Sequence, residues 1–340
     1  MNVSNFGEFN LIKHLMDVIS KDNLIIINNL SQLGYVLSVP SGDDCAVWNS
    51  LDNSHVVTVD ALVENVHFNF DYISWEQLGS KSVSVNLSDI AAMGAKPIFI
   101  TINLGINGDI QVEELTSLYI GIMKKCKLYN VAVIGGDIVR SRDFFISISA
   151  YGVSICNSER SVLKRSGALD KDLIAVTGDI GCSYAGYKLL SEDMYKIHDK
   201  SITDHLINAH NNPIPRVYEG LDLLKLGANS AIDISDGLLD DLNKLCTSSN
   251  VGAEVYSNDL PIDSYLKSAF KSDYLNYALN GGEDYELLFT ASYDDMNKII
   301  NNINTKVTII GKIINNLKIK IIDKSGNELD IDQKGWDHFK

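Results

Sequence analysis

Apolar residues recur along the first half of the chain with two different periods. In residues 9–19 and 111–129 they recur every three or four positions, which predicts two amphipathic helices, and residues 75–93 predict a further helix that Gly94 and Pro97 end. From Phe144 to Tyr151 apolar and polar residues alternate, which predicts a strand with one buried face. Short apolar runs predict further strands at 56–60, 98–104 and 131–134.

A polar stretch at residues 157–171 interrupts this pattern, and the alternation of strands and helices resumes beyond it. We therefore predict a two-domain α/β (α+β) protein with domains of residues 1–153 and 154–340. The strands predicted for the second domain are 173–177, 231–233, 285–290, 307–310 and 317–322. The helices predicted for it are 183–190, 216–226, 238–246 and 294–303.

The composition is that of a folded protein with a strongly acidic surface. The 340 residues are 45% hydrophobic, and 44 acidic residues outnumber 29 basic ones, for a net charge of -15. Such a charge repels nucleic-acid backbones and anionic membranes, so neither is an expected partner. Excess carboxylates suit a protein that binds cations instead.

The sequence favours a cytoplasmic protein. The apolar run at 97–105 is far shorter than the roughly 20 residues that a membrane span needs. The first residues lack the basic start and apolar run of a signal peptide. The five cysteines are scattered without a C-x-x-C pair, which predicts reduced, structural thiols.

Candidate chemistry is concentrated in aspartates that follow apolar segments. Strand ends and strand-to-helix turns are where a rigid scaffold presents functional groups, and carboxylate oxygens are the ligands that Mg²⁺ prefers. The aspartates that share this setting are Asp43, Asp44, Asp60, Asp89, Asp137, Asp233 and Asp236. Together they favour a site for cations and phosphates.

Each aspartate also has a structural interpretation. Asp44 could close a turn, and Asp236 could be the N-cap of the helix that begins near Leu238. Asp89 shares helical spacing with Ser82 and Asn86, so it could belong to a solvated helix face. Other phosphate machinery is absent from the sequence: no P-loop, no protein-kinase core and no G-x-G-x-x-G occurs. Histidine spacing gives no indication of a zinc site.

Longer motifs resemble one known family, from one end of the chain almost to the other. They include SGDDCAV (41–47), VDALVENVHF (59–68), NLSDIAAMGA (86–95), AIDISDGLLDDL (231–242), GGEDYELLFT (281–290) and GWDHF (335–339). The sequence resembles the thiamine-monophosphate kinase family, of the aminoimidazole-ribonucleotide-synthetase-like ATP-binding superfamily. NLSDIAAMGA and GGEDYELLFT are long and specific.

The resemblance implies a fold and an activity. Members transfer the γ-phosphate of ATP directly to thiamine monophosphate, with several Mg²⁺ ions, and form thiamine diphosphate. Their fold has two α/β domains, and the N-terminal sheets of two subunits form a barrel across a homodimer.

The resemblance also implies site residues, motif by motif. The implied metal-binding residues are Asp44, Thr58, Val59, Asp60, Asp89, Asp137, Asp233 and Asp236. The implied ATP-binding residues are Gly136, Asp137, Arg165, Ser235 and, from a weaker alignment, Tyr119. The implied thiamine-monophosphate-binding residues are His67, Glu283 and Trp336. No general base is assigned, because metal ions and positioning carry catalysis in such transfers.

Four positions depart from the family pattern, one of which, Trp336, keeps an aromatic ring where Phe or Tyr is common. Val59 replaces a hydroxyl residue, so only its backbone carbonyl could contact a metal, and Ile138 also lacks the usual hydroxyl. Asn65 stands where glycine is usual. These departures bear on metal number and affinity more than on the reaction.

Two alternatives remain at this point. One is another enzyme of the superfamily, but the chain lacks the N-terminal reactive cysteine of selenophosphate synthetase and the C-terminal cysteine of the hydrogenase-maturation carbamoyl dehydratase. The purine-synthesis members lack GGEDYELLFT and GWDHF in this form. The other is a non-catalytic binder of nucleotide or thiamine phosphate, against which the retained acidic motifs argue.

Overall fold

The chain forms two compact units. The computed structural model describes residues 3–6, 8–39, 47–49, 54–155, 161–194 and 199–331. Unit 1 comprises Met1–Ile90 and Ala95–Asn157, and unit 2 comprises Ala91–Gly94 and Ser158–Lys340. Three candidate site residues from the sequence lie outside the described residues: Asp43, Asp44 and Trp336.

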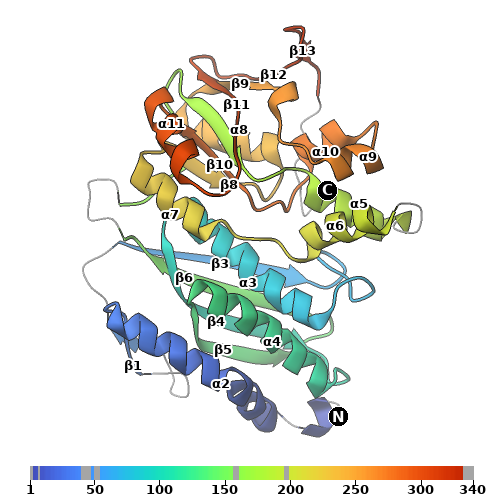
Figure 1. Ribbon diagram of the computed structural model, residues 1–340. Helices are drawn as coiled ribbons and strands as arrows, with labels where there is room; N and C mark the ends of the chain where they lie inside the picture. Colours follow the sequence, from blue (N-terminus) through green and yellow to red (C-terminus); the bar gives the residue numbers. More distant parts are fainter. Residues whose placement is uncertain are drawn as a thin grey trace. The chain divides into compact units, whose positions relative to one another are not determined.

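Unit 1 is built on a four-stranded sheet in the order β3-β6-β4-β5, as far as the described residues show. Only the β4–β5 pair is parallel. Helices α3 and α4 run along this sheet, and α2 packs beside α4 (Figure 1). The bounds in this unit are α1 Val3–Phe6, α2 Glu8–Gln32, β1 Val36–Val39, β2 Val47–Asn49, β3 His55–Val63, α3 Trp75–Ala92, β4 Lys96–Ile106, α4 Val112–Tyr129, β5 Ala132–Arg140 and β6 Phe145–Val153.

The two faces of this sheet differ in exposure. Strand β6 alternates between buried and half-buried residues, as its sequence predicts. Along β3, Val57 and Val59 are 67% and 59% exposed, whereas Val56, Thr58 and Asp60, which alternate with them, are partly covered. Successive residues of a strand point to opposite faces, so the valines mark a face that the helices do not cover.

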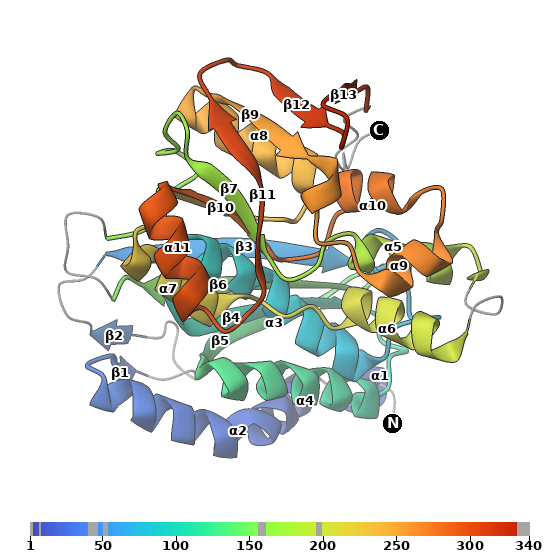
Figure 2. The ribbon, with the colours of Figure 1, turned by 45° about the horizontal axis from the view of Figure 1, so that its top comes forward.

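Unit 2 contains a mixed seven-stranded sheet in the order β13-β12-β9-β11-β7-β10-β8 within the part of the chain that is described. Helices α5, α8, α9 and α10 bury apolar side chains on one face of this sheet. Helix α11 contacts α7 and β10, and Figure 2 shows α8 and α11 on opposite sides of the strands. The bounds are β7 Leu173–Thr177, α5 Cys182–Ser191, α6 Lys200–Asn211, α7 Val217–Leu226, β8 Ser230–Asp233, α8 Leu238–Ser249, β9 Gly252–Tyr256, η2 Ser257–Asp259, α9 Ser264–Ala269, α10 Tyr274–Asn280, β10 Leu287–Ala291, α11 Tyr293–Asn302, β11 Val307–Ile314, β12 Ile319–Ile322 and β13 Glu328–Leu329.

Most predicted elements occur, with three corrections. The first helix is longer than predicted, because α2 continues to Gln32. Residues 135–137 lie inside β5 rather than after its end. The prediction also omitted elements such as α6 and β9, because most residues of α6 are polar and β9 is only five residues long.

Two expectations from composition can be compared with the structure. The described cysteines, Cys126, Cys182 and Cys246, are free and buried, in agreement with structural thiols. Among the described helices, none has both the length and the apolar content to cross a bilayer.

Candidate functional site

In unit 1, a hydroxyl and a carboxylate meet between the sheet and its helix. The Thr58 hydroxyl on β3 donates to Asp89 Oδ2 on α3 at 2.5 Å. On the same side, the Asp60 N–H donates to Asn86 Oδ1 at 3.0 Å. Asn86 is only 1% exposed, so the interpretation of this helix face as solvated is wrong. The structure thus brings Thr58, Asp60 and Asp89 to one location.

Val59 lies between these residues but points the other way. Its side chain is 59% exposed on the uncovered face of the sheet. An apolar side chain there has no ligand atom to offer, so only the backbone carbonyl remains as a donor.

Gly136 and Asp137 are on the far edge of the same sheet, in β5, and both are exposed. Cross-strand pairing aligns Asp60 with Ile148, Ile148 with Ile102, and Ile102 with Gly136. Three strand spacings of about 4.8 Å therefore separate the two edges. Within one chain, the sheet does not bring Asp137 next to Asp60.

His67 follows β3 in a tight turn. Its Nδ1 accepts from Val63 N at 3.0 Å, which leaves the ring proton on Nε2. Asn65 in this turn has φ 61°, a left-handed conformation that glycine and asparagine tolerate best. This conformation explains why Asn65 can replace the usual glycine.

Tyr119 lies in the interior of unit 1. It is 7% exposed on α4, and burial raises the pKa of its hydroxyl above its usual range. Its predicted contact with a nucleotide stays a prediction.

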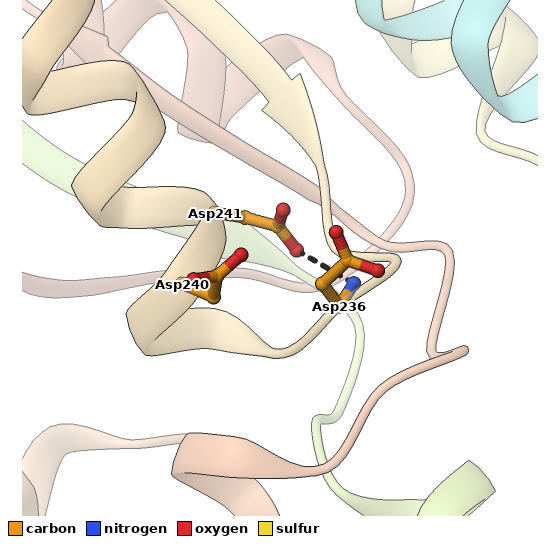
Figure 3. A group of neighbouring side chains, drawn as sticks. All are labelled: Asp236, Asp240 and Asp241. Carbon is orange, nitrogen blue, oxygen red and sulfur yellow. Dashed lines mark hydrogen bonds between the residues drawn. The ribbon is translucent and has the colours of Figure 1, made fainter. Parts of the chain in front are cut away.

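In unit 2, Asp233 ends β8 and the turn after it carries Ser235 and Asp236. The N-cap of α8 is Gly237, without a side-chain cap, so Asp236 is not the N-cap. Atoms of three carboxylates, from Asp236, Asp240 and Asp241, lie within 4.8 Å of one another (Figure 3).

Lys244 lies among these three carboxylates. Its Nζ is 2.8 Å from Asp240 Oδ2 and from Asp241 Oδ1, and it also contacts Asp236. Burial alone would lower the pKa of Lys244, but the hydrogen bonds to the three carboxylates raise it above its usual range. The ammonium offsets the repulsion among the acids.

Arg165 is exposed in the loop before β7, and the end of α8 holds its backbone. Ser249 Oγ donates to Arg165 O at 3.0 Å and accepts from the N–H of Gly167 at 3.1 Å. The guanidinium is therefore presented from an anchored loop.

Glu283 belongs to a strained turn before β10. Both Glu283 and Tyr285 adopt a positive φ, at 66° and 54°. Glu283 Oε2 lies 3.2 Å from Nδ1 of His210, a buried residue of α6, and the Ser183 hydroxyl lies 3.2 Å from the same nitrogen. The polar sequence around His210 indicates a solvated side chain, which is wrong: His210 is buried and pairs with Glu283, 73 positions away in the chain.

Asp284 points to the start of α5. Its carboxylate accepts from Gly181 N at 2.6 Å and from Ser183 N at 3.1 Å, as anions do at helix N-termini. Burial raises the pKa of this carboxyl group to about 7, against the opposing effect of the two N–H groups, although part of the residue is exposed.

Glu286, two residues on, is buried against Arg216. The guanidinium donates from Nε to Oε2 at 2.6 Å and from Nη2 to Oε1 at 2.5 Å, and Thr177 Oγ1 donates to Oε2 at 2.6 Å. Burial raises the pKa of Glu286, and Arg216 opposes that rise. Glu286 is thus part of the support of the turn.

The donor sets fit Mg²⁺ by their chemistry. The hydroxyl of Thr58 and the carboxylates of Asp60 and Asp89 are hard oxygen donors, as are the carboxylates of Asp236 and Asp240. No sulfur or imidazole group takes part in either set as described. These residues could hold Mg²⁺, whereas a soft transition metal would find no preferred ligand.

Two family models match the chain. "AIR synthase related protein, N-terminal domain" matches residues 42–154, and "AIR synthase related protein, C-terminal domain" matches residues 172–324. The two-domain α/β fold with mixed sheets is therefore that of the AIR synthase-related proteins.

Curated relatives narrow the family. The thiamine-monophosphate kinase of Escherichia coli (strain K12) is 33% identical over 338 residues, 98% of each chain. That of Aquifex aeolicus is 33% identical over the full length of both chains, and that of Buchnera aphidicola from Acyrthosiphon pisum is 43% identical over 76% of this chain and 78% of its own. The chain belongs to the thiamine-monophosphate kinase family.

Solved structures of thiamine-monophosphate kinases are similar to this chain over nearly its whole length. Thiamine-monophosphate kinase from Stenotrophomonas maltophilia superposes with a TM-score of 0.80 at 30% identity, covering 90% of this chain and 95% of its own. AaThiL complexed with AMPPCP and TMP superposes with a TM-score of 0.75 at 32% identity, covering 100% and 99%. The hydrogenase maturation protein HypE in complex with ATP, at 15% identity, shares the fold alone.

The raised pKa of Asp284 predicts a dependence of stability on pH. Between about pH 4 and pH 7 the folded protein binds a proton at Asp284 that the unfolded chain, with its ordinary carboxyl pKa of 3.8, has lost. The free energy of unfolding should therefore fall as pH rises, by at most about 1.4 kcal/mol per pH unit. In urea denaturation, Asp284→Asn should make this decline shallower. Asp204→Asn, at an exposed position on α6, is the control, and an unchanged slope in Asp284→Asn would show that Asp284 is ionised when folded.

Proposed function

We propose that this protein transfers the γ-phosphate of ATP to thiamine monophosphate in the presence of Mg²⁺, giving thiamine diphosphate and ADP. The observation that carries this proposal is full-length similarity, at 33% identity, to thiamine-monophosphate kinases. It is supported by the likeness, over the whole chain, to AaThiL complexed with AMPPCP and TMP. The grouping of Thr58, Asp60 and Asp89 in unit 1 and of the carboxylates near the start of α8 in unit 2 also supports it.

We propose that carboxylates of both units hold the metal ions. In unit 1 these are Asp60, Asp89 and the Thr58 hydroxyl, with the Val59 carbonyl as a further donor; in unit 2 they are Asp233 and Asp236. Bound Mg²⁺ would neutralise phosphate charge and stabilise the transferring phosphoryl group. Asp44, a further proposed ligand, lies outside the described residues.

We assign the two substrates to different residues. ATP is proposed to contact Gly136, Asp137, Arg165, Ser235 and Tyr119. Arg165 suits a phosphate, because guanidinium donates two parallel hydrogen bonds. Thiamine monophosphate is proposed to contact His67, Glu283 and Trp336. The indole of a tryptophan can stack on the cationic thiazolium ring of thiamine.

Product analysis tests the function. Purified protein is incubated with ATP, Mg²⁺ and thiamine monophosphate, and thiamine diphosphate is separated by chromatography and read as thiochrome fluorescence. We expect product that disappears with EDTA. ATP binding without product in a folded sample would instead favour a non-catalytic binder.

A charge-removing substitution tests the metal group of unit 1. In Asp89→Asn the amide oxygen can still accept from Thr58, so the fold is retained while the negative charge is lost. We expect turnover to fall by at least about 100-fold, as when a charge partner of the transferring group is lost. Asp109→Asn, at an exposed loop position of the same unit, should stay within about threefold of wild type. Near-normal turnover in Asp89→Asn would remove this residue from the metal group.

We also propose a homodimer formed through the domain of residues 1–153, with the uncovered face of the unit 1 sheet closing a barrel with a second copy. Two findings support it. Val57 and Val59 expose apolar surface on that face. Asp60 and Asp137 are on opposite edge strands of one sheet, so one chain does not bring them together, and we propose that two copies share the site. The free, buried thiols support a cytoplasmic location.

Mixing two inactive variants tests the shared site. Asp89→Asn and Asp137→Asn chains are each expected to be inactive alone. In a mixed dimer one of the two sites carries both substitutions and the other carries none, so each mixed dimer should have about half of wild-type activity. Random pairing of co-expressed chains makes about half of the dimers mixed, so about one quarter of wild-type activity should return in the whole sample. A monomeric mass in light scattering, or no recovery in dimers shown to be mixed, would contradict a site shared between subunits.

A further inference from the structure

Asp241 is a buried carboxylate with a different task for each oxygen. It is 1% exposed on the first turn of α8. Its Oδ2 accepts from the backbone N–H groups of Ser235 and Asp236, both at 3.0 Å. Figure 3 shows the bond to Asp236. Its Oδ1 accepts from Lys244 Nζ at 2.8 Å. One side chain therefore fixes two consecutive peptide units of the turn that precedes α8.

That turn carries groups to which the proposed function gives a role. Ser235 is a proposed ATP contact and Asp236 a proposed metal ligand. We propose that Asp241 is a positioning residue: it holds the 235–236 turn in the conformation that presents both groups, without touching a substrate itself. This inference rests on the proposed function for its kinetic test. Its structural basis does not depend on which molecule receives the phosphate.

The 235–236 turn, which Asp241 holds, is also hydrogen-bonded to the loop that contains Glu283. The Glu283 N–H donates to Ser235 O at 2.8 Å. Gly282 permits this approach, because a Cβ at that position would lie 2.5 Å from the same oxygen. A shift of the 235–236 turn would therefore displace Glu283, the proposed contact of thiamine monophosphate. Asp241 should affect the binding of both substrates.

The local contacts explain why an acid is needed at this position. Without this acceptor, two partly buried N–H groups would lose their hydrogen bonds to a buried carboxylate, which lowers stability. The negative charge also holds Lys244, whose ammonium contacts Asp236 as well. An asparagine could replace the first contribution through its amide oxygen but not the second.

Three variants separate these contributions. Asp241→Ala removes both, and Asp241→Asn keeps an acceptor for the two N–H groups. Asp323→Ala is the matched control: Asp323, in the turn between β12 and β13, also accepts from two backbone N–H groups, of Ser325 and Asn327, both at 2.8 Å. That turn carries no proposed site residue. The kinetic constants for ATP and thiamine monophosphate and the midpoint of the Mg²⁺ dependence are measured for each variant.

We expect Asp241→Ala to lose about 100-fold in kcat/KM, the scale of a small misplacement at a reacting centre, with raised KM for both substrates. Asp241→Asn should recover at least about tenfold of this loss, and Asp323→Ala should stay within about threefold of wild type. A residue that only stabilises the fold would lower the active fraction and leave both KM values unchanged. Unchanged KM values in Asp241→Ala, or equal losses in Ala and Asn, would overturn the proposal.

Two further results keep the test decisive. If Asp241→Ala does not fold, a loss of about 100-fold in Asp241→Asn contradicts the anchoring role, and a loss within about tenfold supports it. If wild type forms no thiamine diphosphate, the proposed function fails by itself. Binding of AMPPCP with Mg²⁺ then tests Asp241, and equal affinities for wild type and Asp241→Ala would overturn the inference.

Discussion

Backbone hydrogen bonds between two turns fix the polar end of the unit 2 sheet. Ile234 N donates to Glu286 O at 2.8 Å and Tyr285 N donates to Ile234 O at 2.9 Å, so the antiparallel pairing of β8 with β10 continues beyond Asp233 and Leu287. Main-chain groups make these bonds, so the bonds themselves do not depend on the ionisation of any side chain. Acidic side chains add to them, because Asp241 holds the N–H groups of Ser235 and Asp236.

A buried ion pair lies directly under these turns. Glu286 is 7% exposed, and removing a carboxylate from water is expensive unless its lone pairs are used. Arg216 and Thr177 use them, and Thr177 Oγ1 also accepts from Leu287 N at 2.8 Å. The pair therefore joins the end of β7, the start of α7 and the start of β10. It is better regarded as a device that fixes these elements than as a large source of stability.

Sequence periodicity predicted the elements but only part of the site. The strand at 144–151 was predictable, because it buries alternate residues. The helix at 75–93 was predictable from the Gly94 and Pro97 that follow it. The grouping of Thr58 with Asp89 needed the crossing of α3 over β3, which no local pattern encodes. Asp241 could have been suspected from two acids in the first turn of α8, a usual complement to the helix dipole. Its bonds to Ser235 and Asp236 depend on the shape of the preceding turn, which Gly237 makes possible with φ 116°.

The strained turn before β10 solves a problem of like charges. Glu283, Asp284 and Glu286 fall within four residues, and carboxylates that share one environment repel each other. Positive φ values at Glu283 and Tyr285 turn successive side chains in different directions, at a cost of order 1 kcal/mol or more for each residue. Glu283 reaches His210, Asp284 reaches the start of α5, and Glu286 reaches Arg216. Since the last two acids are held within the structure, Glu283, with 26% of its side chain exposed, is the acid of this turn best placed to meet a ligand.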